Sequence, residues 1–109
     1  MAQFDVHRNI GRQRGAIPYV VIVQSSLFDK YRRRVVVPMV RRSEVDNLSS
    51  MAGLRMNPVF SIEGVDVVLH PLEIVSVALE QLGEKVTSLA QDGNSITDAL
   101  DELLTRSWR

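Results

Sequence analysis

Two apolar runs rich in β-branched residues constrain the fold most strongly. The first runs from Tyr19 to Val23 in "PYVVIVQSSLF", and the second, "VVVPMV", runs from Val35 to Val40. An unbroken apolar run is typical of a strand that is covered on both faces. The polar segment "DKYRRR" between them predicts that the second strand returns beside the first. Pro38 has no N–H to donate, so we expect it to face a sheet edge or a bulge.

Shorter patterns predict three more strands. "PVFSI" (58–62) and "VDVVL" (65–69) flank Glu63 and Gly64, a pair that suits a two-residue hairpin turn because glycine tolerates positive φ. "IVSVAL" (74–79) predicts one further short strand.

After Gly93 the apolar period changes from that of a strand to that of a helix. We expect a helix from about Asn94 to Arg106, with Asn94 or Ser95 as the cap and Arg106 complementing the dipole. Its apolar stripe must pack on the sheet, whereas Asp98, Asp101 and Glu102 lie away from the stripe. The stripe comprises Ile96, Ala99, Leu100, Leu103 and Leu104.

The segment "SEVDNLSSMAG" suits one short helical turn capped by Ser43, with Asp46 three residues on and a loop ending at Gly53. The chain of 109 residues shows no internal repeat or linker. It therefore predicts one domain, residues 1–109, that is mainly β with one C-terminal α-helix. The architecture expected is a small antiparallel sheet or barrel.

Residue usage narrows the possible chemistry. The chain has no cysteine, so disulfides and thiolate metal sites are excluded. No apolar run approaches the roughly 20 residues that span a bilayer. The charged start "MAQFDVHRNIGRQRG" is unlike a signal peptide. We expect a soluble, cytoplasmic protein.

The formal net charge of zero conceals two halves of opposite sign. Residues 1–56 carry ten Lys/Arg and four Asp/Glu, a balance of +6, and residues 57–109 carry three and nine, a balance of −6. The basic residues of the first half are either solvated beside a strand or form a face for an acidic partner. A nucleic-acid interface is poorly supported, because aromatic residues are not interleaved with them.

No residue pattern identifies a catalyst, a metal site or a cofactor site. His7 and His70 lack ligand spacing, so we expect strand or turn residues. A nucleophile at Ser25 or Ser26 would need a base that the sequence does not identify. We expect Gln24 and Ser25 to bond backbone groups around a bend instead.

Several segments, taken in order, carry a family resemblance. They are "QF" at 3–4, "PYVVIVQSSLFD" at 18–29, "RRVVVPM" at 33–39 and "PVFSIEG" at 58–64. With "SVALEQLGEKVTSL" and "NSITDALDELLT" after them, the set resembles the CcdB family of bacterial toxins over essentially the whole chain.

The resemblance implies an SH3-like barrel of antiparallel strands, shared with MazF-like proteins, that forms a homodimer. Known CcdB-like toxins of plasmid or chromosomal toxin–antitoxin pairs poison DNA gyrase by trapping its cleaved complex with DNA. A CcdA-type antitoxin neutralises them. The expected partners are therefore the gyrase A subunit and a CcdA-like antitoxin, with no cofactor, no metal, no membrane and no sequence-specific nucleic acid.

The family contacts gyrase through the end of its C-terminal helix and through residues after the V-Q-S corner. For Leu27, Phe28 and Leu104 the alternative is packing in the core or in the dimer. The corresponding positions of this chain are Leu27, Phe28, Asp101, Leu104, Thr105, Arg106 and Ser107.

The chain departs from the family at its end. Arg106 and Ser107 stand where the family commonly has Gly-Ile, and Trp108 and Arg109 follow. Three interpretations stay open: a shifted anchor on the same gyrase site, a different target surface, or loss of toxicity. Trp and Arg are the residues most enriched at interface hot spots, which favours a target-binding role for the added pair.

CcdA-like antitoxins bind through an acidic segment, so basic residues are the expected contacts. Two other functions compete with gyrase poisoning: a MazF- or Kid-like ribonuclease that holds RNA phosphates on the basic cluster, and a non-toxic orphan binding module. The candidate antitoxin contacts are Arg12, Arg14, Arg32, Arg33, Arg34, Arg41 and Arg42.

Trp108→Ala should separate an anchor from a core residue. We expect target binding to weaken by about 2 kcal/mol or more, because a buried indole is a typical hot spot. The melting temperature should change little. Calorimetric titration with the target and a thermal melt check this; a large loss of thermal stability with unchanged affinity would make Trp108 a core residue.

Overall fold

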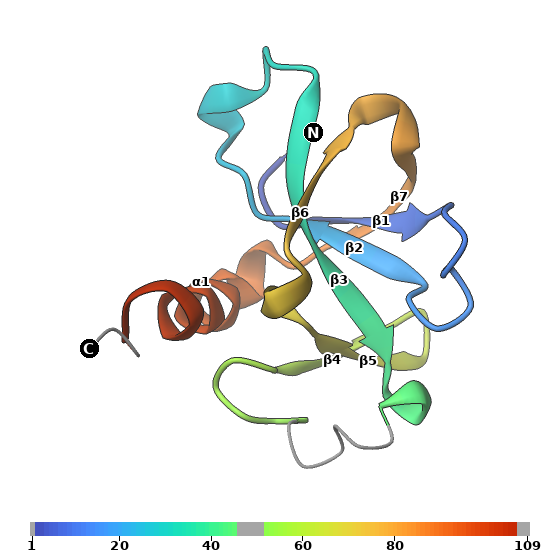
Figure 1. Ribbon diagram of the computed structural model, residues 1–109, viewed down its shortest axis with the longest axis vertical. Coiled ribbons are helices and arrows are strands. Elements are labelled where there is room, and N and C mark those ends of the chain that lie inside the picture. The colour runs from blue at the N-terminus through green and yellow to red at the C-terminus, as the bar shows by residue number, and fades with distance from the viewer. Residues whose placement is uncertain (1, 46–51, 107–109) are drawn as a thin grey trace.

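Strand β3 lies at the centre of one antiparallel sheet. The computed structural model describes residues 2–45 and 52–106, with side chains as far as Leu104. Within this part of the chain the strand order is β4-β5-β3-β2-β1-β7, and β6 also pairs with β3 (Figure 1). The strands are β1 (Asp5–Asn9), β2 (Tyr19–Ile22), β3 (Arg33–Arg41), β4 (Val59–Ile62), β5 (Val65–Leu69), β6 (Val75–Ala78) and β7 (Leu82–Ser88).

β3 has different partners along its two halves. One edge pairs with β2; on the other edge, residues 33–36 pair with β6 and residues 39–41 pair with β5. Pro38 falls between these two pairings, and its carbonyl accepts the backbone N–H of His70 at 3.0 Å. The prediction of a sheet edge for Pro38 is therefore wrong. A central strand tolerates this proline because its position falls in the gap between two partner strands.

Both faces of β2 and β3 are buried, as their unbroken apolar runs predicted. One face packs against the helix. Successive strand residues point to opposite faces, so Ile22 and Val36, which are 1% and 0% exposed, lie on the other face. The main core comprises Val6, Tyr19, Val21, Val37, Met39, Ile62, Val67, Leu69, Leu89, Ile96 and Ala99.

The predicted hairpin is confirmed. β4 and β5 are joined by Glu63 and Gly64, whose φ angles are 53° and 79°. Positive φ at both central residues defines the turn that matches the right-handed twist of the strands. The predicted strand at 74–79 is present as β6.

The C-terminal helix is confirmed close to its predicted bounds, with a last turn of a different type. α1 spans Gly93–Asp101 and continues as a π-helical turn from Glu102 to Arg106. Asp92 occupies the cap position without a side-chain hydrogen bond, so neither Asn94 nor Ser95 is the cap. A Cβ on Gly93 would lie 2.7 Å from the Phe4 ring, so glycine lets the helix start against that ring.

The predicted short helical turn after β3 is present, but its residues differ from those predicted. It is a 3-10 turn from Arg42 to Glu44, with Arg41 before it. Ser43 therefore lies inside the turn instead of capping it, and Asp46 lies outside the described residues. None of the helices in the described part of the chain is long and apolar enough to cross a bilayer.

A cluster of charged side chains joins distant parts of the sheet. Arg8 of β1 donates to Glu84 of β7 at 2.7 Å and to Glu63 of the β4–β5 hairpin at 2.8 Å. The Tyr19 hydroxyl donates to Glu63 at 2.6 Å. The hydrogen bonds from Tyr19 and Arg8 lower the pKa of the Glu63 carboxyl, and burial together with this bond raises the pKa of Tyr19.

Glu63 should make the stability of the fold depend on acid. Its carboxyl has a lower pKa in the folded chain than the ordinary value of 4.5. The stabilisation is therefore present above about pH 4.5 and is lost as the pH falls through the folded value. We expect Glu63→Gln to be less stable than the wild type at pH 7 and to lose less stability between pH 5 and pH 3, which urea unfolding measures.

The matched control is Glu80→Gln, because Glu80 pairs with the exposed Arg32, at 2.6 Å, and with no other residue that the structure describes. An exposed pair contributes little, so this variant should follow the wild type at every pH. An unchanged acid dependence in Glu63→Gln would contradict the role given to Glu63.

Candidate functional site

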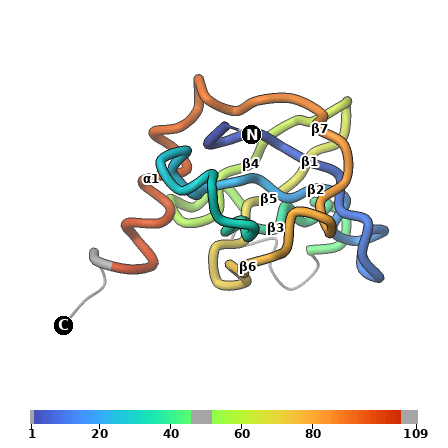
Figure 2. Tube along the Cα trace, turned by 90° about the horizontal axis from the view of Figure 1, so that it is seen from above, coloured from blue at the N-terminus to red at the C-terminus, as the bar shows by residue number. Residues whose placement is uncertain are grey.

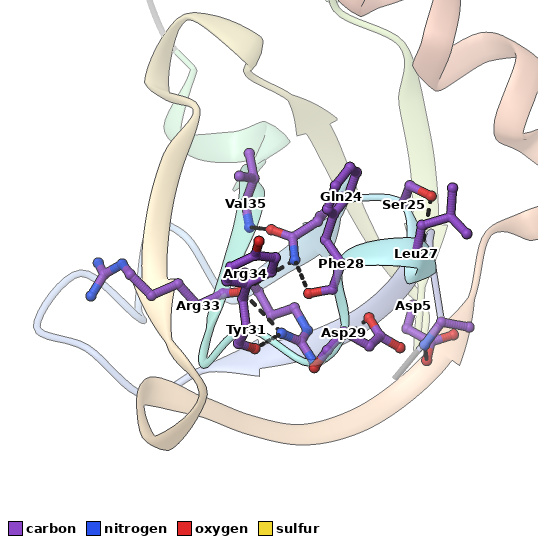
Figure 3. A network of polar contacts seen from close by, with 11 residues as sticks. Asp5, Gln24, Ser25, Leu27, Phe28, Asp29, Tyr31, Arg33, Arg34 and Val35 are labelled. Atoms are coloured by element: carbon purple, nitrogen blue, oxygen red, sulfur yellow. Dashed lines mark hydrogen bonds and ion pairs between the residues drawn. The ribbon is translucent and has the colours of Figure 1, made fainter.

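The turn after β2 is held by the side chains of Gln24 and Ser25. Gln24 Nε2 donates to the carbonyls of Phe28 and Arg33 at 3.3 and 3.2 Å, and its Oε1 accepts the N–H of Val35 at 3.1 Å (Figure 3). Ser25 Oγ accepts the N–H of Leu27 at 3.2 Å. The prediction that Gln24 and Ser25 bond backbone groups around a bend is confirmed.

A buried guanidinium holds the rest of this loop. Arg34 is 4% exposed, and its two Nη atoms donate to the carbonyls of Asp29, Tyr31 and Arg33 at 2.6–2.9 Å (Figure 3). Asp29 Oδ1 lies 3.6 Å from Arg34 Nη2. The prediction that Arg34 belongs to a basic surface is therefore wrong, because the loop encloses this side chain.

The loop that is folded in this way presents its large apolar side chains to solvent. Leu27 is 82% exposed, Phe28 51% and Tyr31 58%. The Phe28 and Tyr31 rings are 6.4 Å apart between centroids, and the hollow beside them measures about 630 Å³. We call these three residues the apolar loop patch. Packing in the core of the chain is thus excluded for Leu27 and Phe28, whereas Tyr31 was missed by the sequence analysis.

The helix end supplies the second part of the predicted target surface. Asp101 is exposed, and Leu104 is 67% exposed although it ends the apolar stripe. The backbone of Thr105 and Arg106 lies in the π-helical turn. In Figure 1 the loop after β2 lies at the upper left of the molecule and α1 lies lower down on the left, and both are again on the left in Figure 2. The predicted contacts Ser107, Trp108 and Arg109 lie outside the described residues.

The candidate antitoxin contacts separate into two groups at opposite ends of β3. Arg32 pairs with Glu80 at 2.6 Å, and Arg33 donates to the Ser76 hydroxyl and carbonyl at 2.8 and 2.7 Å. At the other end, Arg41 Nε donates to the Gly15 carbonyl at 3.1 Å. This bond places Arg41 beside the exposed loop of Arg12 and Arg14, and Arg42 follows in the next turn.

The two histidines are a strand residue and a turn residue, as predicted. His7 lies in β1, is 4% exposed, and has Nδ1 2.9 Å from the Gly83 carbonyl oxygen. His70 precedes the 3-10 turn 71–73. Across residues 2–45 and 52–106, no group of three or more His, Asp or Glu side chains is placed to hold a metal ion.

The fold is that of a small antiparallel β protein with one closing helix and an exposed apolar loop. The chain belongs to the CcdB family. The model of this family, described as "CcdB protein", matches residues 3–105. The resemblance seen in the sequence is therefore confirmed over nearly the whole chain.

A solved structure shares the fold. It is titled "Endoribonuclease in complex with its cognate antitoxin from Mycobacterial species", and it matches with a TM-score of 0.71 at 17% identity. The match covers 100% of this chain and 99% of the other. At this identity the likeness shows the fold alone. A comparison with curated protein sequences gives no match.

Arg34 should be required for the loop to fold, unlike its exposed neighbour. We expect Arg34→Met to lower the free energy of unfolding by about 3 kcal/mol, because the loop carbonyls lose their charged donor. Arg32→Met, the control, should cost less than about 1 kcal/mol, since Arg32 makes an exposed ion pair. Urea unfolding and hydrogen exchange of the amides of residues 29–35 measure both effects. Equal losses in the two variants would contradict this role.

Proposed function

We propose that this chain is the toxin of a toxin–antitoxin pair and acts by binding the gyrase A subunit, thereby poisoning the topoisomerase. Membership of the CcdB family supports a toxin. The observation that carries the proposal is the apolar loop patch, with Leu27 82% exposed on a loop fixed by Gln24 and Arg34. A fixed, exposed apolar loop favours binding because little side-chain and loop ordering remains to be done.

The target surface combines the loop and the helix end. Burying Leu27 would stabilise a complex by about 1.5–3 kcal/mol, in the range of a hot spot. Phe28, which is 51% exposed, would contribute less. Leu104 adds exposed apolar area, and Asp101 adds charge at the same end of the molecule. The positions that follow complete the proposed surface: Thr105, Arg106, Ser107, Trp108 and Arg109.

The antitoxin would neutralise the toxin by placing an acidic segment against its basic residues. The group formed by Arg12, Arg14, Arg41 and Arg42 offers the better surface, because its loops adjoin at the Arg41–Gly15 hydrogen bond. Arg32 and Arg33 form a second, smaller group. Arg34 is excluded from this proposal by its burial. A cytoplasmic homodimer, as in the family, is part of the same proposal.

The experiment compares gyrase inhibition by the wild type with that by Leu27→Ala and by Leu72→Ala. Both residues are exposed leucines, at 82% and 61%, but only Leu27 lies on the proposed surface. We expect Leu27→Ala to weaken inhibition of supercoiling about tenfold or more, with an unchanged melting temperature. Leu72→Ala should inhibit like the wild type. The same samples are assayed for trapped gyrase–DNA cleavage complexes.

Other outcomes separate the competing functions. Cleavage of total RNA by the purified wild type, with supercoiling untouched, would favour a MazF- or Kid-like ribonuclease. Harmless overexpression in the host with retained antitoxin binding would indicate an orphan binding module. If the chain inhibits gyrase and Leu27→Ala does not weaken the inhibition, the proposed surface is wrong although gyrase is the target.

A further inference from the structure

The face of the sheet opposite the helix contains a half-enclosed cavity of about 450 Å³. Val20 and Val36 line it from β2 and β3, Val77 from β6, and Leu82 from β7. This volume falls within the range of small-molecule sites.

The cavity follows from the way in which β3 changes partner. Residues 33–36 pair with β6 and residues 39–41 with β5, so Pro38 stands at the gap between them. The side chains that line this face include Val20, Val36 and Val77, which are short and aliphatic. They leave space instead of filling it, and they give the cavity an apolar wall.

Polar groups at the edge of the cavity have unused hydrogen-bonding capacity. Glu73 and Gln13 make no side-chain hydrogen bond or ion pair with any residue that the structure describes. The enclosed Nδ1 of His70 also has no hydrogen-bond partner within residues 2–45 and 52–106. A ligand with N–H groups would find an acceptor in the Glu73 carboxylate and in the Gln13 amide oxygen.

The charge around the cavity favours a cation. Arg8 is the only Lys or Arg in the lining, and its guanidinium is shared between Glu63 and Glu84 at 2.8 and 2.7 Å. Arg8 and Glu73 are the charged residues of the lining, whereas Glu63 and Glu84 lie outside it and neutralise Arg8. The carboxylates therefore outnumber the cation, and Glu73 is the one without an ionic partner in the described chain.

We propose that this cavity binds a small organic cation: an apolar body of about the size of an aromatic ring with a primary ammonium group. The apolar body contacts Val75 and Val77, and the ammonium donates to the Glu73 carboxylate. The cavity shares no lining residue with the hollow beside Phe28 and Tyr31. The proposal therefore stands apart from the proposed gyrase surface and is tested without gyrase.

The test is an NMR titration of the ¹⁵N-labelled full chain with three probes of similar shape: 2-phenylethylamine, 2-phenylethanol and 3-phenylpropionate. We expect saturable shifts at the amides of Val36, Val77 and Leu82, with a dissociation constant below about 10 mM for the amine. The amine should bind about fivefold more tightly than the alcohol, and the carboxylate more weakly still.

Two exposed carboxylates provide matched variants. Glu73→Gln should abolish the preference for the amine over the alcohol but leave binding of the alcohol unchanged. Glu80→Gln, whose side chain lies outside the lining, should keep the preference. Both positions are exposed, so both variants should fold. Val77→Phe, which fills the cavity, should remove binding of all three probes.

The proposal is overturned by any of three results. The first is the absence of saturable binding of the amine by the wild type. The second is a set of shifts centred on Phe28 and Tyr31 in place of Val36 and Val77. The third is equal binding of amine and carboxylate, because the argument from Glu73 then fails.

Discussion

The rest of the structure depends on the way in which one strand, β3, divides its hydrogen bonds between two partners. Its first half pairs with β6 and its last residues pair with β5. The division bends the sheet, buries Ile22 and Val36 on the face away from α1, and leaves the cavity at Pro38. The length of β3 separates the basic residues at its two ends into two surfaces.

A buried charge makes the apolar loop patch possible. The loop carbonyls of Asp29, Tyr31 and Arg33 all accept hydrogen bonds from Arg34, inside the loop. With the backbone satisfied from within, Leu27 and Phe28 need no role in the interior and remain outside. Burying a guanidinium is costly unless its hydrogen bonds are supplied. The buried hydrogen bonds of Arg34 thus hold the loop that exposes Leu27 and Phe28.

Sequence patterns predicted those parts of the fold that depend on residues close together in the chain. The unbroken runs of β2 and β3 and the Glu63–Gly64 turn were correct because apolar runs and positive φ leave clear patterns. β1 and β7 were missed because their sequences, DVHRN and LGEKVTS, are mostly polar without regular alternation, and because they pair across most of the chain, with register shifts. Leu27 and Phe28 came from the family resemblance. Nothing in "RRR" distinguishes Arg34 from Arg32, since only the folded loop decides which is enclosed.

The Arg8–Glu84 contact has a consequence for the order of folding. It joins residues 76 positions apart, whereas Gln24 and Val35, which bond within the loop, are 11 positions apart. Contacts that are close in sequence lose less chain entropy and form earlier. We therefore expect a nascent chain to shape its apolar loop while most of β7 and α1 is still being synthesised. Until then one edge of β1 lacks its partner strand, so the growing chain exposes a surface for aggregation that the finished protein has covered.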